Sequence, residues 1–309
     1  MQIFDLHCDT LYKVTLENNS IVTNNCHLSY DKLLKYNGYT QVVAIWIPDE
    51  YRGNSAVKLV DDCYNKLLTS LQQCKKINRV NNFNQLNNNH NVILAIEGGA
   101  ALAGDINNVK KLRNMGVRFI TLTWNGTNEI GDGIRSENPK GLTEFGKLVI
   151  PEIENNNIII DISHASDQLF WQTAQLAKRP FVATHSNSRT ICSNLRNLTD
   201  EQFKHIVNIG GIVGLNFYRY FITDNGIADF SDLEKHLYHF LSLGGENTVA
   251  LGSDFDGAEM PQCITGVESM QTFYEYLLSK NYSQILLEKL FYKNAFNFCS
   301  NYDKLYNEV

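Results

Sequence analysis

Short runs of apolar, mostly β-branched residues recur along the chain, and the longer segments between them carry apolar residues at helical spacing. The runs are continuously apolar rather than alternating, which is typical of strands buried on both faces of a parallel sheet. We therefore predict eight buried strands, at Gln2–Leu6, Gln41–Ile47, Val92–Ile96, Arg118–Thr123, Ile158–Ile162, Phe181–Thr184, Gly211–Asn216 and Thr248–Gly252.

Helices are predicted after most of these strands, and two more near the end of the chain. They cover Ala56–Leu71, Asn107–Asn114, Thr143–Glu154, Asp167–Ala177, Asp200–Asn208, Asp232–Leu243, Glu268–Leu278 and Ser283–Phe298. Alternating strands and helices imply parallel pairing through right-handed crossovers. Eight repeats predict closure, and so we expect an α/β protein with a (β/α)8 TIM barrel.

No linker long enough to separate domains interrupts this pattern, and so we expect residues 1–309 to form one barrel domain with C-terminal helices. The Asn-rich segments 81–91 and 155–157 are predicted as loops. A doubly wound open sheet is the alternative fold. It usually carries a G-x-G-x-x-G phosphate turn, which the segment from Gly98 to Gly104 does not match.

Composition and charge exclude several classes of partner. The 309 residues are 43% hydrophobic and 19% charged, with 27 Lys and Arg against 33 Asp and Glu, a net charge of −6. No basic run exceeds a pair, so we expect neither nucleic acid nor an anionic membrane as a partner. No apolar run approaches the roughly 20 residues of a membrane span.

The seven cysteines are scattered and include no C-x-x-C pair, which indicates reduced thiols rather than a disulfide framework. The chain begins MQIFDLHCDT and ends in a polar segment, and we expect no secretion signal and no lipid anchor. A cytoplasmic protein is the corresponding prediction.

Acidic or imidazole side chains follow five of the predicted strands, on the face of a barrel where catalytic residues gather. His7 and Asp9 are two residues apart in extended chain, so both point to the same side. Imidazole and carboxylate together suit zinc or a similar divalent ion, and His164 and His185 offer two more nitrogens. Glu97 could bridge two ions, which could share a hydroxide and polarise a carbonyl for hydrolysis.

Each of these residues also has a structural interpretation. A single histidine at a strand end more often makes a hydrogen bond than binds a metal, Glu97 could cap the next helix, and Asp254 could brace a turn. The coincidence at five strand ends favours a site. The remaining histidines fall in loops or helices and are interpreted as structural, namely His27, His90, His205, His236 and His239.

The segments DLHCDT, EGG, LTW, DISH, THSN and GSDFDG occur in this order on predicted strands 1, 3, 4, 5, 6 and 8. They resemble the membrane dipeptidase (renal dipeptidase) family of zinc peptidases, which have amidohydrolase-like barrels of the metal-dependent hydrolase type. The resemblance covers nearly the whole chain. It implies two divalent metal ions, with Zn²⁺ expected, and a zinc-dependent dipeptidase acting on small dipeptides. The implied metal ligands are His7, Asp9, Glu97, His164 and His185, and the implied catalytic proton carrier is Asp254.

The resemblance also implies residues that bind substrate. Arg196 matches the position whose guanidinium receives the terminal carboxylate of the substrate, although by itself it would be interpreted as a solvated loop charge. Tyr220 matches another pocket residue. Better-known family members have a histidine after strand 4, where this chain has Trp124 and Asn125. We expect Trp124 to narrow the pocket and Asn125 to donate to the substrate instead.

Two other functions remain open at this point. The same scaffold could serve a deacetylase, a lactonase or a deaminase that acts on another C–N or C–O bond. It could also be an inactive barrel used for binding. A homodimer through outer helices is a further possibility, although no exposed stripe identifies an interface.

Overall fold

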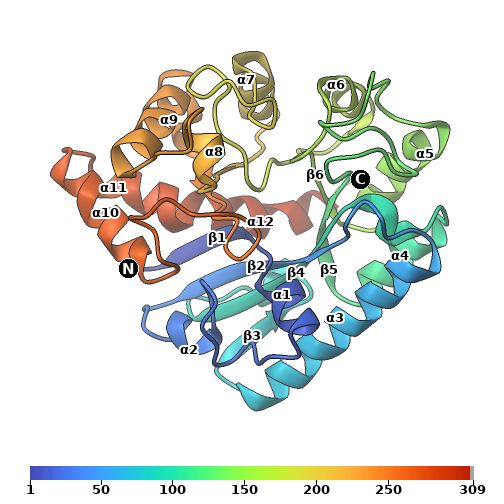
Figure 1. Ribbon diagram of the computed structural model, residues 1–309, viewed down its shortest axis with the longest axis horizontal. Coiled ribbons are helices and arrows are strands. Elements are labelled where there is room, and N and C mark those ends of the chain that lie inside the picture. The colour runs from blue at the N-terminus through green and yellow to red at the C-terminus, as the bar shows by residue number, and fades with distance from the viewer. Residues whose placement is uncertain (307–309) are drawn as a thin grey trace.

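The strands form one parallel sheet that curls in the centre of the protein, with helices packed around it (Figure 1). The computed structural model describes residues 1–306. The sheet order is β6-β5-β4-β2-β1-β8-β7, and β3 pairs with β4. The strands are β1 (Ile3–Cys8), β2 (Tyr39–Trp46), β3 (Ile77–Val80), β4 (His90–Glu97), β5 (Val117–Thr121), β6 (Ile159–Asp161), β7 (Val213–Leu215) and β8 (Val249–Leu251).

One predicted strand differs in the structure. The segment Phe181–Thr184 forms two isolated parallel bridges, Asp161 with Val182 and Ala183 with Val213, rather than a continuous ladder. The ladder stops because the Thr184 N–H donates to the Asp161 side chain (2.9 Å) and not to a neighbouring strand. These bridges lie between β6 and β7, which the sheet order leaves as its two edges.

Strand β3 was not predicted from the sequence. Its four residues read Ile-Asn-Arg-Val, and only the first and last are buried. A run this short with a polar middle carries no continuous apolar signal. The predicted loop at 81–91 also differs, because it contains a 3₁₀ turn (Phe83–Gln85) and the first two residues of β4.

The predicted helices are present, the last of them divided in two, whereas three short helices, α1, α2 and α8, were not predicted. They are α1 (Thr10–Leu16), α2 (Tyr30–Leu33), α3 (Asn54–Gln73), α4 (Asn107–Asn114), α5 (Glu144–Asn155), α6 (Asp167–Leu176), α7 (Asp200–Asn208), α8 (Arg219–Ile222), α9 (Phe230–Ser242), α10 (Ser269–Ser279), α11 (Gln284–Glu288) and α12 (Asn294–Tyr306). The predicted helix Ser283–Phe298 is divided into α11 and α12 by a π-helical turn at Lys289–Lys293.

Side-chain caps explain where many of these helices begin. A Ser, Thr or Asp oxygen accepts a backbone N–H of the first turn and satisfies a donor that the helix itself leaves free. The caps are Thr143 for α5, Ser166 for α6, Thr199 for α7, Asp229 for α9 and Ser283 for α11. Four of these five helices begin at or next to the predicted residue, and α9 begins two residues earlier.

Two buried apolar clusters pack on opposite faces of the strands. Ile93 and Ala95 of β4 belong to one cluster, whereas the alternating Val92, Leu94 and Ile96 belong to the other. The first cluster also takes side chains from the neighbouring strands, from Val182 and Ile212, and from α12. Burial on both faces explains why the strands are continuously apolar.

Among the described residues, no helix is both long enough and apolar enough to cross a membrane. None of the seven cysteines takes part in a disulfide.

Candidate functional site

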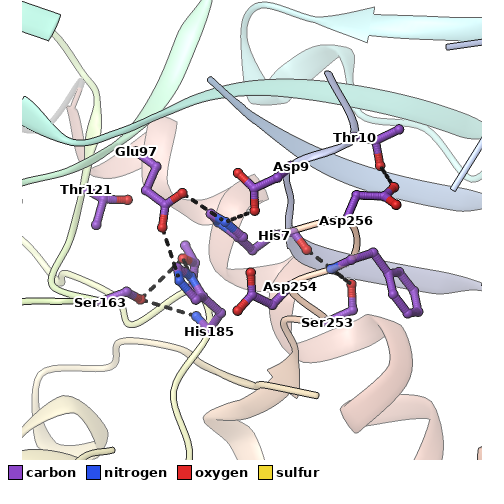
Figure 2. A network of polar contacts seen from close by, with 12 residues as sticks. His7, Asp9, Thr10, Glu97, Thr121, Ser163, His185, Ser253, Asp254 and Asp256 are labelled. Atoms are coloured by element: carbon purple, nitrogen blue, oxygen red, sulfur yellow. Dashed lines mark hydrogen bonds and ion pairs between the residues drawn. The ribbon is translucent and has the colours of Figure 1, made fainter. Parts of the chain in front are cut away.

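Glu97, the last residue of β4, lies at the centre of a buried polar cluster (Figure 2). Its Oε1 is 2.9 Å from Nε2 of His164 and 3.4 Å from Nε2 of His185, and its Oε2 is 3.5 Å from Nε2 of His7. All four side chains are buried. The carboxyl ends of β1, β4 and β6 and the segment after Ala183 thus bring together the residues predicted from separate strand ends.

His7 and Asp9 complete this cluster from β1. Strand β1 is extended to Cys8, so both side chains point to the same side, with Nε2 of His7 3.3 Å from Oδ2 of Asp9. The His7 ring stacks on His185 at 3.8 Å between centroids. The five side chains predicted as metal ligands therefore share one site. They form two groups that have Glu97 in common, and within each group the ligand atoms lie within 4.8 Å of one another.

The donor set of this cluster fits divalent cations. Oδ1 of Asp9 is buried without a hydrogen-bond partner among the described residues, an arrangement that is costly unless a ligand satisfies it. Burial raises the pKa of Asp9 to about 8, and the negative charge of Glu97 adds to the shift. A cation would offset both effects, and mixed imidazole and carboxylate donors suit zinc or a similar ion.

The protonation states of His164 and His185 suit metal binding, which requires neutral imidazoles. Burial lowers the pKa of His164 to about 4, and the charge of Arg196 contributes. Burial and the charge of His7 hold the pKa of His185 well below its ordinary value.

His7 differs: burial lowers its pKa, but the charges of Glu97 and Asp9 outweigh burial and raise the pKa well above its ordinary value, so His7 must lose a proton to bind a metal. Burial raises the pKa of Glu97, but the charge of His7 and the nearby imidazoles lower it by more, so the net pKa lies well below normal. Glu97 is thus an anion at neutral pH.

A hydrogen-bond relay fixes the tautomer of His185. The Thr184 hydroxyl donates to Oδ2 of Asp161 (2.7 Å), so its oxygen accepts from Nδ1–H of His185 (2.8 Å). Nε2 of His185 therefore keeps its lone pair, facing Glu97. The buried Asp161 carboxylate is held in turn by the hydroxyls of Thr121 (2.6 Å) and Ser163 (2.8 Å).

Asn125 contacts Nδ1 of His164 as Thr184 contacts Nδ1 of His185. Its Oδ1 lies 3.0 Å from Nδ1 of His164, so the amide oxygen accepts from Nδ1–H and the lone pair of Nε2 faces Glu97. The sequence predicted Asn125 as a donor to the substrate. The structure places its oxygen against His164, a contact that the sequence did not predict.

Asp254 follows β8 and lies beside His7 and His185 (Figure 2). The side-chain amide of Asn216 donates to its Oδ2 (3.0 Å). Burial raises the pKa of Asp254, His7 partly opposes the shift, and Glu97 adds to it. A carboxyl group whose pKa lies above normal is suited to move protons.

Backbone strain is concentrated at this site. His164, Asp254 and Asp256 have φ of 67°, 63° and 68°, in the left-handed region that residues other than glycine rarely adopt. Gly257 is required by close approach, because a Cβ there would lie 2.0 Å from Oδ2 of Asp9. Such positions persist at functional sites when surrounding contacts hold them in place.

A cavity of about 610 Å³ opens onto the cluster. Asp9, Glu97, His164 and Asp254 lie at its polar part, and its volume suits a small organic ligand. Its remaining walls are Tyr12, Lys13, Leu16, Glu17, Trp46, Trp124, Asn125, Arg135, Tyr218, Phe221, Asp256, Gly257, Ala258 and Glu259. A second cavity of about 890 Å³, lined in part by Asn81, Arg113 and Asp303, includes no predicted site residue.

Of the four residues that were predicted to bind the substrate, two line the cavity and two do not. Trp124 and Asn125 line the cavity, whereas Arg196 and Tyr220 do not. Tyr220 is 37% exposed, and Tyr218, two residues earlier, lines the cavity instead. The sequence offered no basis for preferring Tyr218, because both tyrosines follow the same strand.

Arg196 is buried behind the cavity wall. Its guanidinium donates to Oγ of Ser186 (2.8 Å) and to the carbonyl of His185 (3.0 Å). The guanidinium carbon lies 5.5 Å from the ring of Phe221, which lines the cavity. Its Nε–H is buried without a partner among the described residues, so the side chain keeps unused donor capacity next to the cluster.

Fold and cluster together define a class of protein, an α/β scaffold of the metal-dependent hydrolase type with a histidine and carboxylate site at the carboxyl ends of parallel strands. Residues 1–308 match the family described as Membrane dipeptidase (Peptidase family M19). The chain belongs to this family. The family resemblance noted in the sequence is confirmed, and so, at the level of the family, is the prediction of a metal-dependent dipeptidase.

Individual relatives are similar to this chain over much of its length. A Klebsiella pneumoniae protein named "Uncharacterized protein in pqqA 5'region" is 34% identical over 213 residues, 66% of this chain and 79% of that protein. Mouse dipeptidase 3 is 26% identical over 253 residues. That match covers 79% of this chain but 51% of mouse dipeptidase 3, so the chain spans about half the length of that relative.

Solved structures show the same fold. The metallopeptidase named dipeptidase AC, of family M19, has a TM-score of 0.89 at 25% identity, with 97% of this chain and 98% of that chain covered. A metallopeptidase from Rhodobacter sphaeroides, solved with a phosphinate mimic of the dipeptide L-Ala-D-Ala, also has a TM-score of 0.89, at 24% identity and the same coverage. The latter likeness concerns the fold alone.

Proposed function

We propose that this protein hydrolyses the peptide bond of small dipeptides with two bound divalent ions, zinc being the expected metal. One observation carries the proposal: the five predicted ligands and Asp254 form one cluster, four of whose six side chains line a cavity, in a chain of a dipeptidase family. His7 and Asp9 would hold one ion, His164 and His185 the other, and Glu97 would lie between them. Bound ions of this kind polarise the scissile carbonyl and lower the pKa of water.

The residues of the chain supply the other parts of the reaction. Asp254 accepts a proton from the attacking water and delivers it to the departing amine, a role that its raised pKa supports. Asn216 holds one oxygen of Asp254 and so orients the other toward the cluster. Arg196 binds the terminal carboxylate through its Nε–H, which requires the Phe221 side chain to move aside, because Phe221 lines the cavity and Arg196 packs behind it.

The scaffold that we propose is a closed (β/α)8 barrel formed by a single domain over residues 1–309. The two bridges of the segment Phe181–Thr184 support closure, because they connect β6 to β7 through this segment. The apolar cluster shared by the neighbouring strands, Val182 and Ile212 supports it as well. A cytoplasmic location and a homodimer stay predictions, and sedimentation velocity would measure the oligomeric state.

The decisive test is metal analysis of the purified protein, followed by hydrolysis of a dipeptide panel with and without a chelator. We expect about two divalent ions per chain, and activity that is lost with the chelator and restored by zinc. A metal-loaded protein that cleaves an ester or an acetylated amine but no dipeptide would instead support another amidohydrolase-type activity.

Dipeptides should be hydrolysed much faster than their C-terminal amides if Arg196 binds the terminal carboxylate. Removing that anion leaves a buried guanidinium without its partner, so we expect kcat/KM to fall by roughly 10-fold or more. The measurement compares L-Ala-L-Ala with L-Ala-L-Ala amide. Arg196→Lys should reduce the difference, because a lysine cannot bind the carboxylate in a bidentate manner. Equal rates for acid and amide would contradict the role of Arg196.

Thr184→Val should weaken metal binding by about 10- to 100-fold, the usual cost of removing a partner that orients a histidine ligand. The substitution removes the hydroxyl that connects Asp161 to His185 and leaves the size of the side chain nearly unchanged. Competition with a chromogenic chelator measures the affinity.

Thr121→Val is the matched control for this prediction. The Thr121 hydroxyl also donates to Asp161, but it does not lie between that carboxylate and a histidine ring, so its removal should leave metal affinity within a few-fold of wild type. Equal losses in both variants would show that the Asp161 network acts on stability and not on His185.

A further inference from the structure

The segment of residues 122–135, which follows β5, contacts both the main chain and the ring of His164. The Ile134 N–H donates to the His164 carbonyl (2.8 Å), and the Thr123 hydroxyl donates to the same oxygen (3.3 Å). Oδ1 of Asn125 lies 3.0 Å from Nδ1 of the His164 ring. Since His164 has a left-handed main chain (φ 67°), it depends on surrounding contacts of this kind to keep its conformation.

Asn125 is itself fixed by its neighbours in this segment. Its carbonyl accepts the Arg135 N–H (2.8 Å), and the N–H of the next residue, Gly126, donates to Oδ2 of Asp49 (2.9 Å). Gly133 packs so closely that a Cβ there would lie 2.6 Å from the Asn125 carbonyl oxygen. The amide oxygen of Asn125 is therefore presented from a backbone that is held on several sides, as a supporting residue of a functional site requires.

The contact of Asn125 with the ring determines which nitrogen of His164 can bind a metal ion. An imidazole that binds a metal through one nitrogen usually donates its other N–H to an oxygen, which fixes its tautomer and orientation. Here the Asn125 oxygen accepts from Nδ1–H, and Nε2 lies 2.9 Å from Oε1 of Glu97 and 3.0 Å from Nε2 of His185. The free nitrogen of His164 thus points into the shared centre of the cluster.

We propose that Asn125 is a positioning residue of the metal site, which holds His164 in the tautomer and orientation that bind an ion, and that it is not a donor to the substrate. This inference rests on the proposed function, because it concerns one of the two ions proposed there, and it deepens that function. Asn125 acts on His164 from the segment after β5, whereas the Thr184 relay acts on His185 alone.

The test measures the zinc affinity of full-length Asn125→Leu by competition with a chromogenic chelator. Leucine is close to asparagine in size but offers no acceptor to Nδ1–H. We expect one of the two ions to bind about 10- to 100-fold more weakly, the usual cost of removing a partner that orients a histidine ligand, and the other to stay within a few-fold of wild type. Asn125→Asp keeps an acceptor oxygen and should bind both ions at least as tightly as wild type.

A dipeptidase assay at saturating zinc distinguishes positioning from substrate binding. Aspartate and leucine have no side-chain N–H, so neither could replace an amide that donates to the substrate. If Asn125 acts through His164, excess zinc should bring kcat/KM for L-Ala-L-Ala in both variants to within a few-fold of wild type. A rate that stays more than about 10-fold low in both variants with two ions bound would return Asn125 to the role of a substrate donor and overturn the proposal.

Thr127→Val serves as the matched control in the same segment. The Thr127 hydroxyl donates to Oδ1 of Asp132 (2.6 Å), and Thr127 is not among the residues that line the cavity, so both zinc affinities should stay unchanged. Wild-type affinity for both ions in a folded Asn125→Leu protein would overturn the proposal. If that variant does not fold, Asn125→Asp decides, because weakened zinc binding there would overturn it equally.

The two readouts also separate this proposal from the proposed function. A wild-type protein that binds two ions but hydrolyses no dipeptide would contradict the dipeptidase. The zinc affinities of the Asn125 variants would still decide whether Asn125 supports the metal site.

Discussion

His185→Ala is expected to lose bound metal and to abolish dipeptide hydrolysis. Nε2 of His185 lies 3.4 Å from Oε1 of Glu97 and 3.0 Å from Nε2 of His164, so it contributes to the shared centre of the cluster. Alanine removes the ligand atom and leaves a space where solvent can compete for the ion. We expect one of two ions to be lost per chain and turnover to fall below detection, measured by elemental analysis and a dipeptide assay.

His239→Ala is the matched control for this variant. His239 pairs with Asp200 at 2.8 Å and belongs to none of the groups of potential metal ligands among the described residues. Its removal should change neither metal content nor rate. Thermal unfolding of both variants distinguishes the loss of a metal-binding side chain from the loss of the fold. Full metal occupancy in a folded His185→Ala protein would contradict the assignment of His185 as a metal ligand.

The strand pattern could be predicted because strands buried on both faces must be apolar throughout. The strand prediction was wrong where a segment does not meet this condition. β3 has only its end residues buried, so its sequence resembles a loop. Phe181–Thr184 has a strand-like composition, but the side chain of Asp161 takes the N–H of Thr184 and ends the ladder. Such competition between a side chain and the backbone depends on tertiary contacts, which a local pattern does not contain.

The clustering of the five proposed ligands could be predicted from the sequence for a related reason. Parallel strands gather their carboxyl ends on one face, so polar residues at those ends must meet whatever their separation in sequence. Trp46 also ends a strand and lines the cavity, but an apolar residue at a strand end carries no signal for a metal site. By contrast, the contact of Asn125 with His164 and the position of Tyr218 in the cavity depend on loop conformation, which residue spacing does not determine.

Asp254→Asn should lower kcat by roughly 10²- to 10⁴-fold, the usual contribution of general acid–base catalysis, while both metal ions stay bound. An asparagine at this position can still accept the hydrogen bond from Asn216, so the local geometry is maintained. It cannot accept the proton of the attacking water at neutral pH. The measurement is kcat for L-Ala-L-Ala together with the metal content of the same sample.

The turn that holds Asp254 also supplies the control. Asp256 is a second carboxylate with φ near that of Asp254, but its oxygens already accept from the Thr10 hydroxyl (2.5 Å) and the His27 N–H (2.9 Å). Asp256→Asn should therefore retain most of the rate. If Asp254→Asn lost metal as well as activity, Asp254 would be a ligand. If it kept more than a tenth of the rate, the proton would have to travel through another group, because the introduced amide offers no basic oxygen to carry it.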